Sequence, residues 1–403
     1  MRHFFCLLLS CSLFCAVVSL IPSVSAQDNA AGGVIATSQV QVGAERTALY
    51  LPKLKHKRLG LVVNQTSRVG QLHLVDFLQA SGLDVRRIFA PEHGFRGTAD
   101  AGASIEDGVD TRSGVEVISL YGEQKKPGAE QLADIDMLIF DIQDVGVRYY
   151  TYISTLHYLM EAAAKHQKPL MVLDRPNPNG DYVDGPVLKP AYRSFVGMHP
   201  IPLIHGLTVG ELARMIKGEN WIEGAQDLQL TIIPVANYTH ITRYTLPIPP
   251  SPNLPNQQAI RLYPSLGLFE GTVVSVGRGT SFPFQAIGLP LQTAGNFSFT
   301  PESVAGAKYP PYRGEVCYGQ DLRNVTPPPY LNLDYLRHFY QAYAQQYPEH
   351  PEKFFNDFFK RLAGNETLQA SIMAGKSNAA IRQEWQDDLN SYRQLRRKYQ
   401  IYR

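Results

Sequence analysis

The sequence has little net charge and few cysteines, and it lacks the common nucleotide-binding and hydrolase motifs. Its 403 residues include 38 Lys and Arg against 36 Asp and Glu, a formal net charge of +2. This balance predicts no polyanion-binding surface at the level of the whole chain, so nucleic acid is not an expected partner. The composition, 44% hydrophobic and 18% charged, argues against a disordered, collagen-like or coiled-coil protein.

Three of the four cysteines lie inside an apolar run over residues 4–21. A small-residue pattern of the A-x-A kind follows, and it predicts a signal peptide cleaved after Ala26. A run of about 18 residues would also serve as a short membrane anchor, but the cleavage pattern favours removal, with no stable membrane insertion afterwards. We therefore expect an exported protein, periplasmic or secreted, that retains only Cys317 and has no intramolecular disulfide. Cys317 has no evident basic partner and is expected to be buried rather than catalytic.

Short apolar runs alternate with helical segments over the first part of the chain. This pattern predicts an α/β fold with a mostly parallel sheet that is covered on both faces. The alternation ends before the proline-rich stretch at 247–255, which predicts a linker, and the remainder combines proline-broken strands with helices near 333–345, 351–362 and 378–399. The expected strands of the sheet cover residues 59–63, 85–90, 115–120, 137–142, 170–173 and 230–235.

Polar motifs follow four of the predicted strands. In a doubly wound sheet, ligands bind beyond the carboxyl ends of the strands. Each motif alone is typical of a cap or a turn, but four at one rim predict a polar active-site cleft. The motifs are NQTS at 64–67, PEHGFRG at 91–97, DIQDVGVRYYTY at 141–152 and DRPNPNG at 174–180.

Glu92 and His93 form the strongest candidate pair, in a loop bounded by a proline and a glycine. A glutamate close to Phe89 and Phe95 is a candidate general acid, because apolar surroundings raise the pKa of a carboxyl group. The alternative is structural, with Glu92 forming a loop salt bridge to Arg96. The pair therefore predicts acid catalysis, with the salt bridge as the competing interpretation.

Asp141 and Asp144 supply further carboxylates. A glycosidase needs a second carboxylate, either as nucleophile or as the base for water. Arg148 and Arg175 have the donors to bind a carboxylate-bearing substrate bidentately. Their structural interpretation is pairing with Asp144 and Asp174 nearby.

Other chemistries lose support because their motifs are missing. No G-x-G-x-x-G after a strand, Walker A, G-x-S-x-G, H-E-x-x-H or paired-cysteine zinc motif occurs in the sequence. Neither a cofactor nor a metal is expected. A metal-dependent hydrolase remains an alternative, with His93, Asp141, Asp144 and His205 as its donors.

Of two further motifs, one is interpreted as structural and the other as uninformative. Thr208 and Glu211 have the spacing of a capping box, which predicts the start of a helix. The segment Gly277–Thr280 is rich in glycine but lacks the spacing of a nucleotide-binding loop.

Together these motifs resemble the bacterial exo-β-N-acetylmuramidases of the NamZ type. The resemblance extends from about residue 57 to the C-terminus, and it is most specific at VNQTS, APEHGFRG, DIQDVGVRYYTYIST and VLDRPNPNGDYVDG, with further matches at 196–211 and 263–280. It implies release of terminal β-N-acetylmuramic acid from the non-reducing end of peptidoglycan-derived MurNAc-GlcNAc fragments. It also implies a Rossmann-like catalytic domain with a smaller α+β domain after it. The competing function is a cell-wall sugar-binding protein without catalysis.

With this resemblance the candidate site and the division of the chain become specific. Glu92 matches the family's proposed catalytic glutamate, with His93 beside it and Asp141 preferred as second carboxylate over the substrate's own acetamido group. The expected domains are a signal peptide (1–26), a tether (27–44), a Rossmann-like catalytic domain (45–250) and a C-terminal auxiliary domain (251–403). The expected substrate-binding residues, whose arginines would bind the lactyl carboxylate of the sugar, are Asn64, Arg96, Gln143, Asp144, Arg148, Tyr150, Asp174, Arg175, Asn177, His205 and Glu270.

Overall fold

The computed structural model describes residues 39–96 and 107–403. The predicted signal peptide and most of the predicted tether lie outside the described residues. By its internal contacts the chain divides into residues 1–38 and residues 39–403, and the second unit is described below. No helix within the described ranges is both long and apolar enough to cross a membrane.

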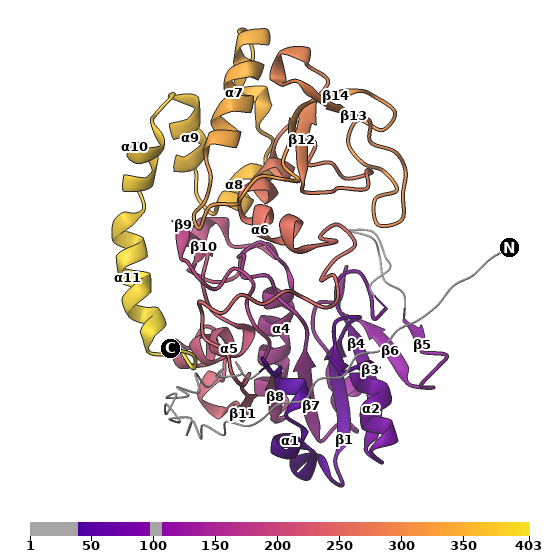
Figure 1. Cartoon of the computed structure of the whole chain (residues 1–403). Helices are drawn as coiled ribbons and strands as arrows, with labels where there is room; N and C mark the ends of the chain where they lie inside the picture. The colour runs from indigo at the N-terminus through magenta and orange to yellow at the C-terminus, as the bar shows by residue number, and fades with distance from the viewer. Residues whose placement is uncertain (1–38, 97–106) are drawn as a thin grey trace, which may run out of the picture. The chain divides into compact units, whose positions relative to one another are not determined.

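A seven-stranded sheet forms the centre of the first part of the chain (Figure 1). All neighbouring strands are parallel except the last pair, β6 and β5, which is antiparallel. The predicted mostly parallel α/β sheet is therefore confirmed. In spatial order the strands are β11 (Leu230–Ile233), β8 (Leu170–Leu173), β7 (Met137–Asp141), β1 (Arg58–Val63), β4 (Asp84–Ala90), β6 (Glu116–Ser119) and β5 (Gly108–Val109).

Both faces of this sheet are covered, which explains why its strands are continuously apolar. Successive side chains of a strand point to opposite faces, so Leu61 and Val63 join one buried cluster while Val62 joins the other. The first cluster includes side chains from α1 (Thr47–Leu54) and α2 (Leu74–Ala80). The second includes side chains from α4 (Tyr152–Lys165) and α5 (Val209–Gly218).

Helix α5 begins at the predicted capping box. The hydroxyl of Thr208 accepts from the backbone N–H of Glu211 at 3.2 Å, and the Glu211 carboxylate accepts from the backbone N–H of Thr208 at 2.9 Å. These two bonds satisfy N–H groups that the first turn of a helix leaves without partners. The prediction of a helix start at this position is confirmed.

The second part of the chain is smaller and mixes helices with an antiparallel sheet (Figure 1). Cys317 begins the central strand of this sheet and is fully buried, as predicted. The sheet has the order β12 (Ala286–Leu289), β14 (Cys317–Asp321), β13 (Phe297–Phe299), and the helices are α6 (Gln257–Leu266), α7 (Asp334–Gln346), α8 (Phe358–Ala363), α9 (Thr367–Met373), α10 (Asn378–Gln383) and α11 (Gln386–Arg397).

Two of the helices predicted in this part are interrupted. The segment 351–362 begins as a 3-10 turn over Pro351–Phe354, before α8. The segment 378–399 breaks between α10 and α11, where Glu384 binds Ser371 and Lys376 and the Trp385 side chain is buried. The helix predicted at 333–345 forms as α7.

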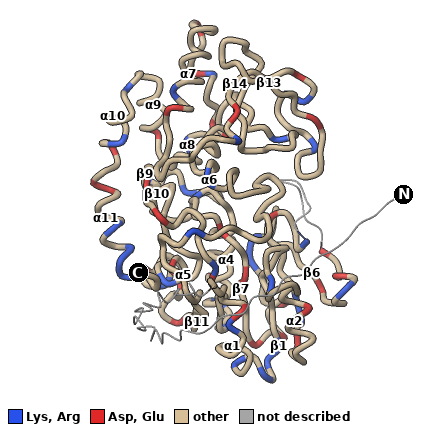
Figure 2. Tube along the Cα trace, in the orientation of Figure 1, with Lys and Arg blue, Asp and Glu red and all other residues tan. Residues whose placement is uncertain are grey.

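Short elements complete the described chain, and charges of both signs are spread over it (Figure 2). The end of the chain returns to helix α5, since the backbone N–H of Ile401 donates to Glu211 at 2.7 Å. The short elements are β2 (Arg68–Val69), β3 (Leu72–His73), α3 (Ala129–Leu132), β9 (Asp184–Val187), β10 (Pro202–Ile204), and 3-10 turns at Gly43–Glu45, Pro190–Tyr192, Ala225–Asp227, Gly267–Gly271 and Gln292–Ala294.

Candidate active site

The four polar motifs predicted at strand ends follow strands that are neighbours in the sheet. Strands β8, β7, β1 and β4 are adjacent in the spatial order, and all four run in the same direction. The motifs therefore begin at one edge of the sheet, as expected for a doubly wound fold. Their side chains separate into two groups, because some line a cavity and others are buried within the protein.

A cavity of about 310 Å³ lies beyond these strand ends, and we call it the Glu92 cavity. Residues from both parts of the chain line it. The first part contributes the loops after β4, β6 and β7 and the loop between β9 and β10, and the second part contributes α6, α8 and the segments around them. The lining residues are Glu92, His93, Tyr121, Tyr149, Tyr150, Thr151, Tyr152, Phe195, Val196, Ser251, Asn253, Leu254, Tyr263, Glu270, Arg278, Phe284, Phe358 and Leu362.

Glu92 is half-buried in this cavity and is held by hydroxyl groups. The Thr151 hydroxyl, at the start of α4, lies 2.5 Å from Glu92 Oε2. Burial raises the pKa of Tyr121, and the neighbouring Glu92 carboxylate raises it further. A hydroxyl donates to a carboxylate and accepts from a carboxylic acid, so Thr151 fits both protonation states of Glu92. This is the environment that a group exchanging a proton with a substrate requires.

His93 adopts a backbone conformation that is uncommon for a residue with a side chain. Its φ is 67°, and Gly94 follows with a φ of 76°. A left-handed conformation at a histidine costs free energy, and such residues concentrate at functional sites. The turn directs the imidazole toward the second part of the chain, where Nε2 lies 3.4 Å from the Ser251 hydroxyl.

Glu270 and Arg278 form an ion pair in the wall of the cavity. Arg278 donates to Glu270 Oε1 from Nη2 at 2.6 Å and from Nε at 3.0 Å. The guanidinium also lies 5.1 Å from the centre of the Phe284 ring. Burial lowers the pKa of Arg278, but the Glu270 carboxylate outweighs this effect and raises it, so the guanidinium stays charged.

Three tyrosines at the start of α4 form part of the wall. The Tyr150 hydroxyl donates to the carbonyl of Pro250 at 2.8 Å, and the Tyr149 hydroxyl donates to the carbonyls of Tyr263 and Pro264. The bonds of Tyr149 connect the first part of the chain to the second, and the bond of Tyr150 holds the proline-rich stretch that precedes the second part. The buried tyrosines present ring surface to it, which suits the apolar face of a sugar.

The structure corrects the expectation that Asp141 supplies the second carboxylate of the site. Asp141 ends β7 with its side chain fully buried, and it does not line the cavity. Both of its carboxylate oxygens bind Arg175, at 2.6 Å from Nε and 2.9 Å from Nη2. The expectation that Arg175 binds substrate is corrected by the same contact, because its donors serve Asp141 and the carbonyl of Arg68.

Arg148 was expected to bind a substrate carboxylate, but its guanidinium is fully buried and bound to backbone carbonyls. Nη1 donates to Pro186 and Ile201, and Nη2 donates to Leu362 and Ala363 at the end of α8. Hydrogen bonds from a charged donor to buried carbonyls stabilise a fold strongly. Arg148 therefore joins the two parts of the chain instead of meeting a ligand.

Asp174, Asp144 and His205 are likewise buried away from the cavity. Asp174 accepts from the Thr208 and Tyr402 hydroxyls at 2.7 and 2.6 Å, so it anchors the start of α5 and the end of the chain. Asp144 Oδ2 accepts from the backbone N–H of Gly146 and lies 4.0 Å from His205 Nε2. These geometries correct the expectation that the three side chains contact substrate.

The remaining polar candidates stabilise loops. Asn64 Oδ1 accepts from the backbone and hydroxyl of Thr66, Gln143 Nε2 donates to the carbonyls of Asp144 and Pro176, and Asn177 Nδ2 donates to Leu207. Arg96 is exposed and binds Asp110 at 2.7 Å. Of the fourteen residues predicted from the sequence, those that line the cavity are Glu92, His93, Tyr150 and Glu270.

The predicted alternative of a metal centre is not assembled by these residues. Within residues 39–96 and 107–403, no group of three or more His, Cys, Asp or Glu side chains is arranged to hold a metal ion. His93 lies against Ser251, while Asp141 is bound to Arg175. Asp144 and His205 lie 4.0 Å apart, but the four proposed donors do not come together at one point.

Sequence reasoning missed Arg278 and Thr151, which both contact a predicted residue. Arg278 lies in the glycine-rich segment 277–280 that was interpreted as uninformative. Its spacing of eight residues from Glu270 gave no local signal, because Glu270 lies in the short 3-10 turn Gly267–Gly271 and Arg278 lies beyond its end, so no helix brings the two side chains together. Thr151 directly follows the predicted Tyr150, and its position at the start of a helix was the available clue.

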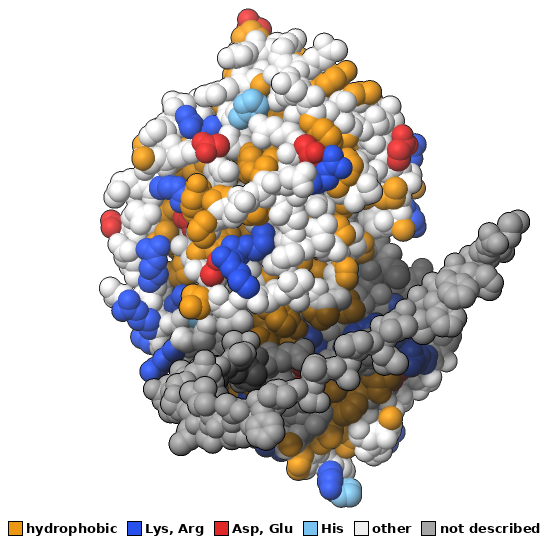
Figure 3. Space-filling view, in the orientation of Figure 1, with side chains coloured by type: hydrophobic (Ala, Val, Ile, Leu, Met, Phe, Trp, Pro, Cys, Tyr) orange, Lys and Arg blue, Asp and Glu red, His pale blue; other side chains and the backbone are white. Residues whose placement is uncertain are grey.

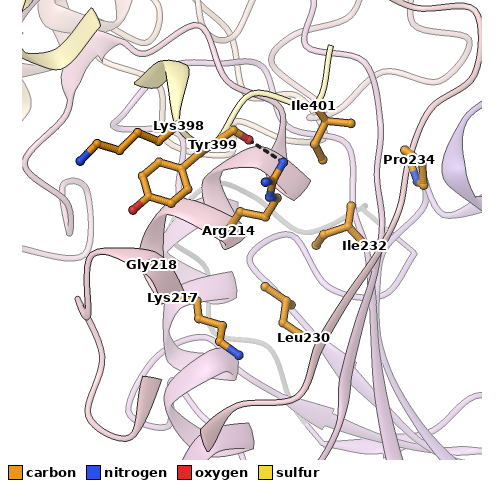
Figure 4. Close-up of a pocket in the computed structure, with 9 residues that line it drawn as sticks. All are labelled: Arg214, Lys217, Gly218, Leu230, Ile232, Pro234, Lys398, Tyr399 and Ile401. Carbon is orange, nitrogen blue, oxygen red and sulfur yellow. Dashed lines mark hydrogen bonds between the residues drawn. The ribbon is translucent and has the colours of Figure 1, made fainter. Parts of the chain in front are cut away.

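A second cavity, elsewhere in the structure, is lined by basic and apolar side chains (Figure 4). It has a volume of about 510 Å³ and lies between α5, β11 and the end of the chain. Its cations serve the fold, since Arg214 donates to the carbonyl of Tyr399 and Lys217 to that of Leu228. It shares no lining residue with the Glu92 cavity, and its described lining residues include no carboxylate.

On the face seen in Figure 3, charged side chains are scattered among apolar and neutral ones.

Comparison with known proteins identifies the family. The family model described as exo-β-N-acetylmuramidase NamZ, N-terminal, matches residues 59–258, and the C-terminal one matches residues 261–402. The chain belongs to the NamZ family. The resemblance found in the motifs and the expectation of a glycoside hydrolase are thereby confirmed. The predicted domain division at 250 and 251 remains a prediction.

Individual proteins are similar to this chain over at least 90% of its length. The peptidoglycan β-N-acetylmuramidase NamZ of Bacillus subtilis strain 168 is 37% identical over 402 residues, covering 95% of this chain and 96% of that protein. A crystal structure of a DUF1343 family protein from Bacteroides fragilis is 44% identical, with a TM-score of 0.83, and covers 91% of this chain and 99% of that one. A second such protein from the same organism is 28% identical, with a TM-score of 0.78, covering 90% and 99%.

Proposed function

We propose that this chain removes terminal β-linked N-acetylmuramic acid from the non-reducing end of peptidoglycan fragments, and that Glu92 is its general acid. Membership of the NamZ family and the name of the Bacillus subtilis relative support the reaction. The observation that carries the role of Glu92 is its place in a cavity of about 310 Å³, among tyrosine rings and beside an arginine. A cavity of this size is at the lower end of small-molecule sites, as expected for one terminal sugar.

In the proposed reaction Glu92 protonates the glycosidic oxygen as its bond to C1 of the terminal sugar breaks, and the rest of the fragment leaves with that oxygen as a hydroxyl group. A water molecule then supplies the new hydroxyl group at C1, and the proton it releases restores the Glu92 carboxylic acid. The Thr151 hydroxyl holds Glu92 before the transfer and can remain hydrogen-bonded to it afterwards. Asp141 has no part in this proposal because it is buried against Arg175.

Arg278 takes the role that the sequence suggested for Arg148 and Arg175. Among the described residues that line the cavity, Arg278 is the only arginine. Muramic acid differs from glucosamine by its lactyl carboxylate, and a guanidinium is the side chain best suited to bind a carboxylate. Glu270 uses two of the five donors of Arg278 through one oxygen, which leaves others for a ligand.

We also propose that the protein works outside the cytoplasm, in the periplasm or as a secreted protein. The apolar run at 4–21 with its cleavage pattern supports this location, and so does a cell-wall substrate. Detection of the protein in the periplasmic or culture fraction, shortened by about its first 26 residues, is the expected result of cell fractionation. A full-length protein in the cytoplasm would contradict the proposal.

The reaction is tested with two chromogenic substrates that differ only in the lactyl group. We expect the purified protein to release the dye from an aryl β-N-acetylmuramide and to act far more slowly on the matching β-N-acetylglucosaminide. A sugar-binding protein without catalysis would release dye from neither substrate. Activity retained in the presence of a chelator would separate this reaction from a metal-dependent hydrolase.

A further inference from the structure

A larger cavity of about 770 Å³ adjoins the Glu92 cavity, and we call it the Tyr309 cavity. The two cavities share two lining residues, Glu270 and Arg278. The ion pair between these side chains, with Nη2 and Oε1 2.6 Å apart, therefore forms a wall between them. A molecule that occupies both cavities would therefore lie against this pair.

A hydrogen bond connects the two cavities at a second place. Asn253 lines the Glu92 cavity, and its Nδ2 donates at 2.9 Å to the carbonyl of Gly306, which lines the Tyr309 cavity. Both residues are buried. The relative position of the two cavities is therefore fixed by buried contacts on more than one side.

The Tyr309 cavity is mostly apolar, with Glu270, Arg278 and Lys308 as its charged lining residues, and it includes an exposed aromatic ring. Val273, Val274 and Val276 line it together with prolines, and Tyr309 is 87% exposed. Concave sites lined mainly by hydrophobic and aromatic side chains, with a few polar groups, are typical of ligand binding. A tyrosine ring packs against the C–H face of a sugar while its hydroxyl remains in water.

The walls of the Tyr309 cavity are held in place without a ligand. The Tyr312 hydroxyl donates to the carbonyl of Val273 at 2.6 Å, and the backbone N–H of Val273 donates to the carbonyl of Phe354 at 3.0 Å. Val304 and Ala307 exchange two backbone hydrogen bonds just before Tyr309. A site that is formed in advance loses little entropy when it binds.

We propose that the Tyr309 cavity binds the leaving-group side of the substrate, that is, the saccharide that follows the terminal sugar. This inference rests on the proposed function. An exo-acting glycosidase holds one sugar on one side of the scissile bond and the rest of the chain on the other side. The smaller cavity contains Glu92 and fits the terminal sugar, and the larger cavity on the other side of the Glu270–Arg278 pair fits the remainder.

The test compares substrates with different leaving groups. An aryl β-N-acetylmuramide has a small leaving group, whereas the disaccharide MurNAc-GlcNAc and longer fragments place sugars in the Tyr309 cavity. For Tyr309→Ala we expect kcat/KM to fall about five- to tenfold on the saccharides and to stay within about twofold on the aryl glycoside. Since Tyr309 is exposed, its removal is not expected to disturb the fold.

Tyr347→Ala is the matched control. Tyr347 is 45% exposed and does not line either cavity, so both substrate classes are expected to keep their kcat/KM. Equal losses on all substrates for Tyr309→Ala, or no loss on any, would overturn the proposal for the Tyr309 cavity. Failure of the unaltered protein to cleave the aryl glycoside would overturn the proposed function instead, so the two failures are distinguishable.

Discussion

Arg278 donates two hydrogen bonds to a single oxygen of Glu270, across a loop of eight residues in the second part of the chain. The pair is partly exposed to the Glu92 cavity, with 18% of the Arg278 side chain and 26% of the Glu270 side chain accessible. Because Glu270 fixes the guanidinium plane, the remaining donors of Arg278 are oriented before a ligand arrives. The second part of the chain thus supplies the positive charge of a site whose proposed acid comes from the first.

This arrangement predicts that Arg278 determines the selectivity for muramic acid. For Arg278→Gln we expect kcat/KM on an aryl β-N-acetylmuramide to fall about tenfold to a hundredfold, because a hydrogen bond to a charged group contributes about 1.5–3 kcal/mol. The slower reaction on the matching glucosaminide, which has no carboxylate, is expected to change little. Steady-state kinetics with both substrates give the ratio of kcat/KM on the muramide to kcat/KM on the glucosaminide for each protein.

Arg278→Lys provides the conservative comparison, because it keeps the charge but loses the planar arrangement of donors. We expect this variant to recover part of the selectivity. If Arg278 only held Glu270 in place, both substrates would lose activity by the same factor, and that outcome would contradict the assignment.

The buried pair of Asp141 and Arg175 predicts a stability effect. For Asp141→Asn we expect the free energy of unfolding to fall by about 3–5 kcal/mol, because Arg175 would remain buried without its partner charge. The double variant Asp141→Leu, Arg175→Met should lose less unfolding free energy than the single variants Asp141→Leu and Arg175→Met lose in sum. Urea unfolding measures the stability of all four variants. A fully stable but inactive Asp141→Asn variant would instead support the catalytic role expected from the sequence.

Asp144 predicts a pH dependence of stability. Burial raises its pKa to about 7, although the backbone N–H of Gly146 opposes this in part, whereas an unfolded aspartate has a pKa of about 3.9. The folded protein therefore binds the proton more tightly, so the stabilisation is complete below about pH 4 and is lost as the pH rises to about 7. Burial lowers the pKa of His205, which faces Asp144, to about 3, so His205 stays neutral over this range.

The variant Asp144→Asn tests this dependence. Its side-chain oxygen can still accept from Gly146, but it does not titrate. Between pH 5 and pH 8 we expect the unaltered protein to lose about 2.5 kcal/mol of unfolding free energy relative to the variant, because about a third of the total stabilisation is already lost below pH 5. Urea unfolding at both pH values measures the difference. Parallel curves for the two proteins would show that Asp144 is ionised in the folded state throughout.

The sheet could be predicted from the sequence because its signals are local. Each parallel strand is a short apolar run such as LMVL at 170–173, and each run ends in a polar motif. The capping box at Thr208 and Glu211 is also local, since its two residues contact one another. Glu92 could be chosen as a candidate general acid because its loop directly follows a predicted strand, which is also a local signal.

The roles of the arginines could not be predicted, since they depend on contacts between distant segments. Arg148 binds the carbonyls of Leu362 and Ala363, more than 200 residues away, and Gly364 packs against its guanidinium. Arg175 follows Asp174 in sequence but pairs with Asp141, because β7 and β8 are neighbours in the sheet. No sequence motif marked Arg278, and it became a candidate only because it lines the Glu92 cavity in the structure.

The central claim is that Glu92 performs the acid step in its cavity, and the variant Glu92→Gln tests it most directly. Release of N-acetylmuramic acid from the disaccharide MurNAc-GlcNAc is measured for the unaltered protein, for Glu92→Gln and for the control Glu123→Gln, an exposed glutamate outside the cavity. We expect Glu92→Gln to lose at least about a hundredfold in kcat, as for removal of a general acid, with unchanged thermal unfolding, and the control to stay fully active. Near-normal release by a folded Glu92→Gln variant would contradict the account.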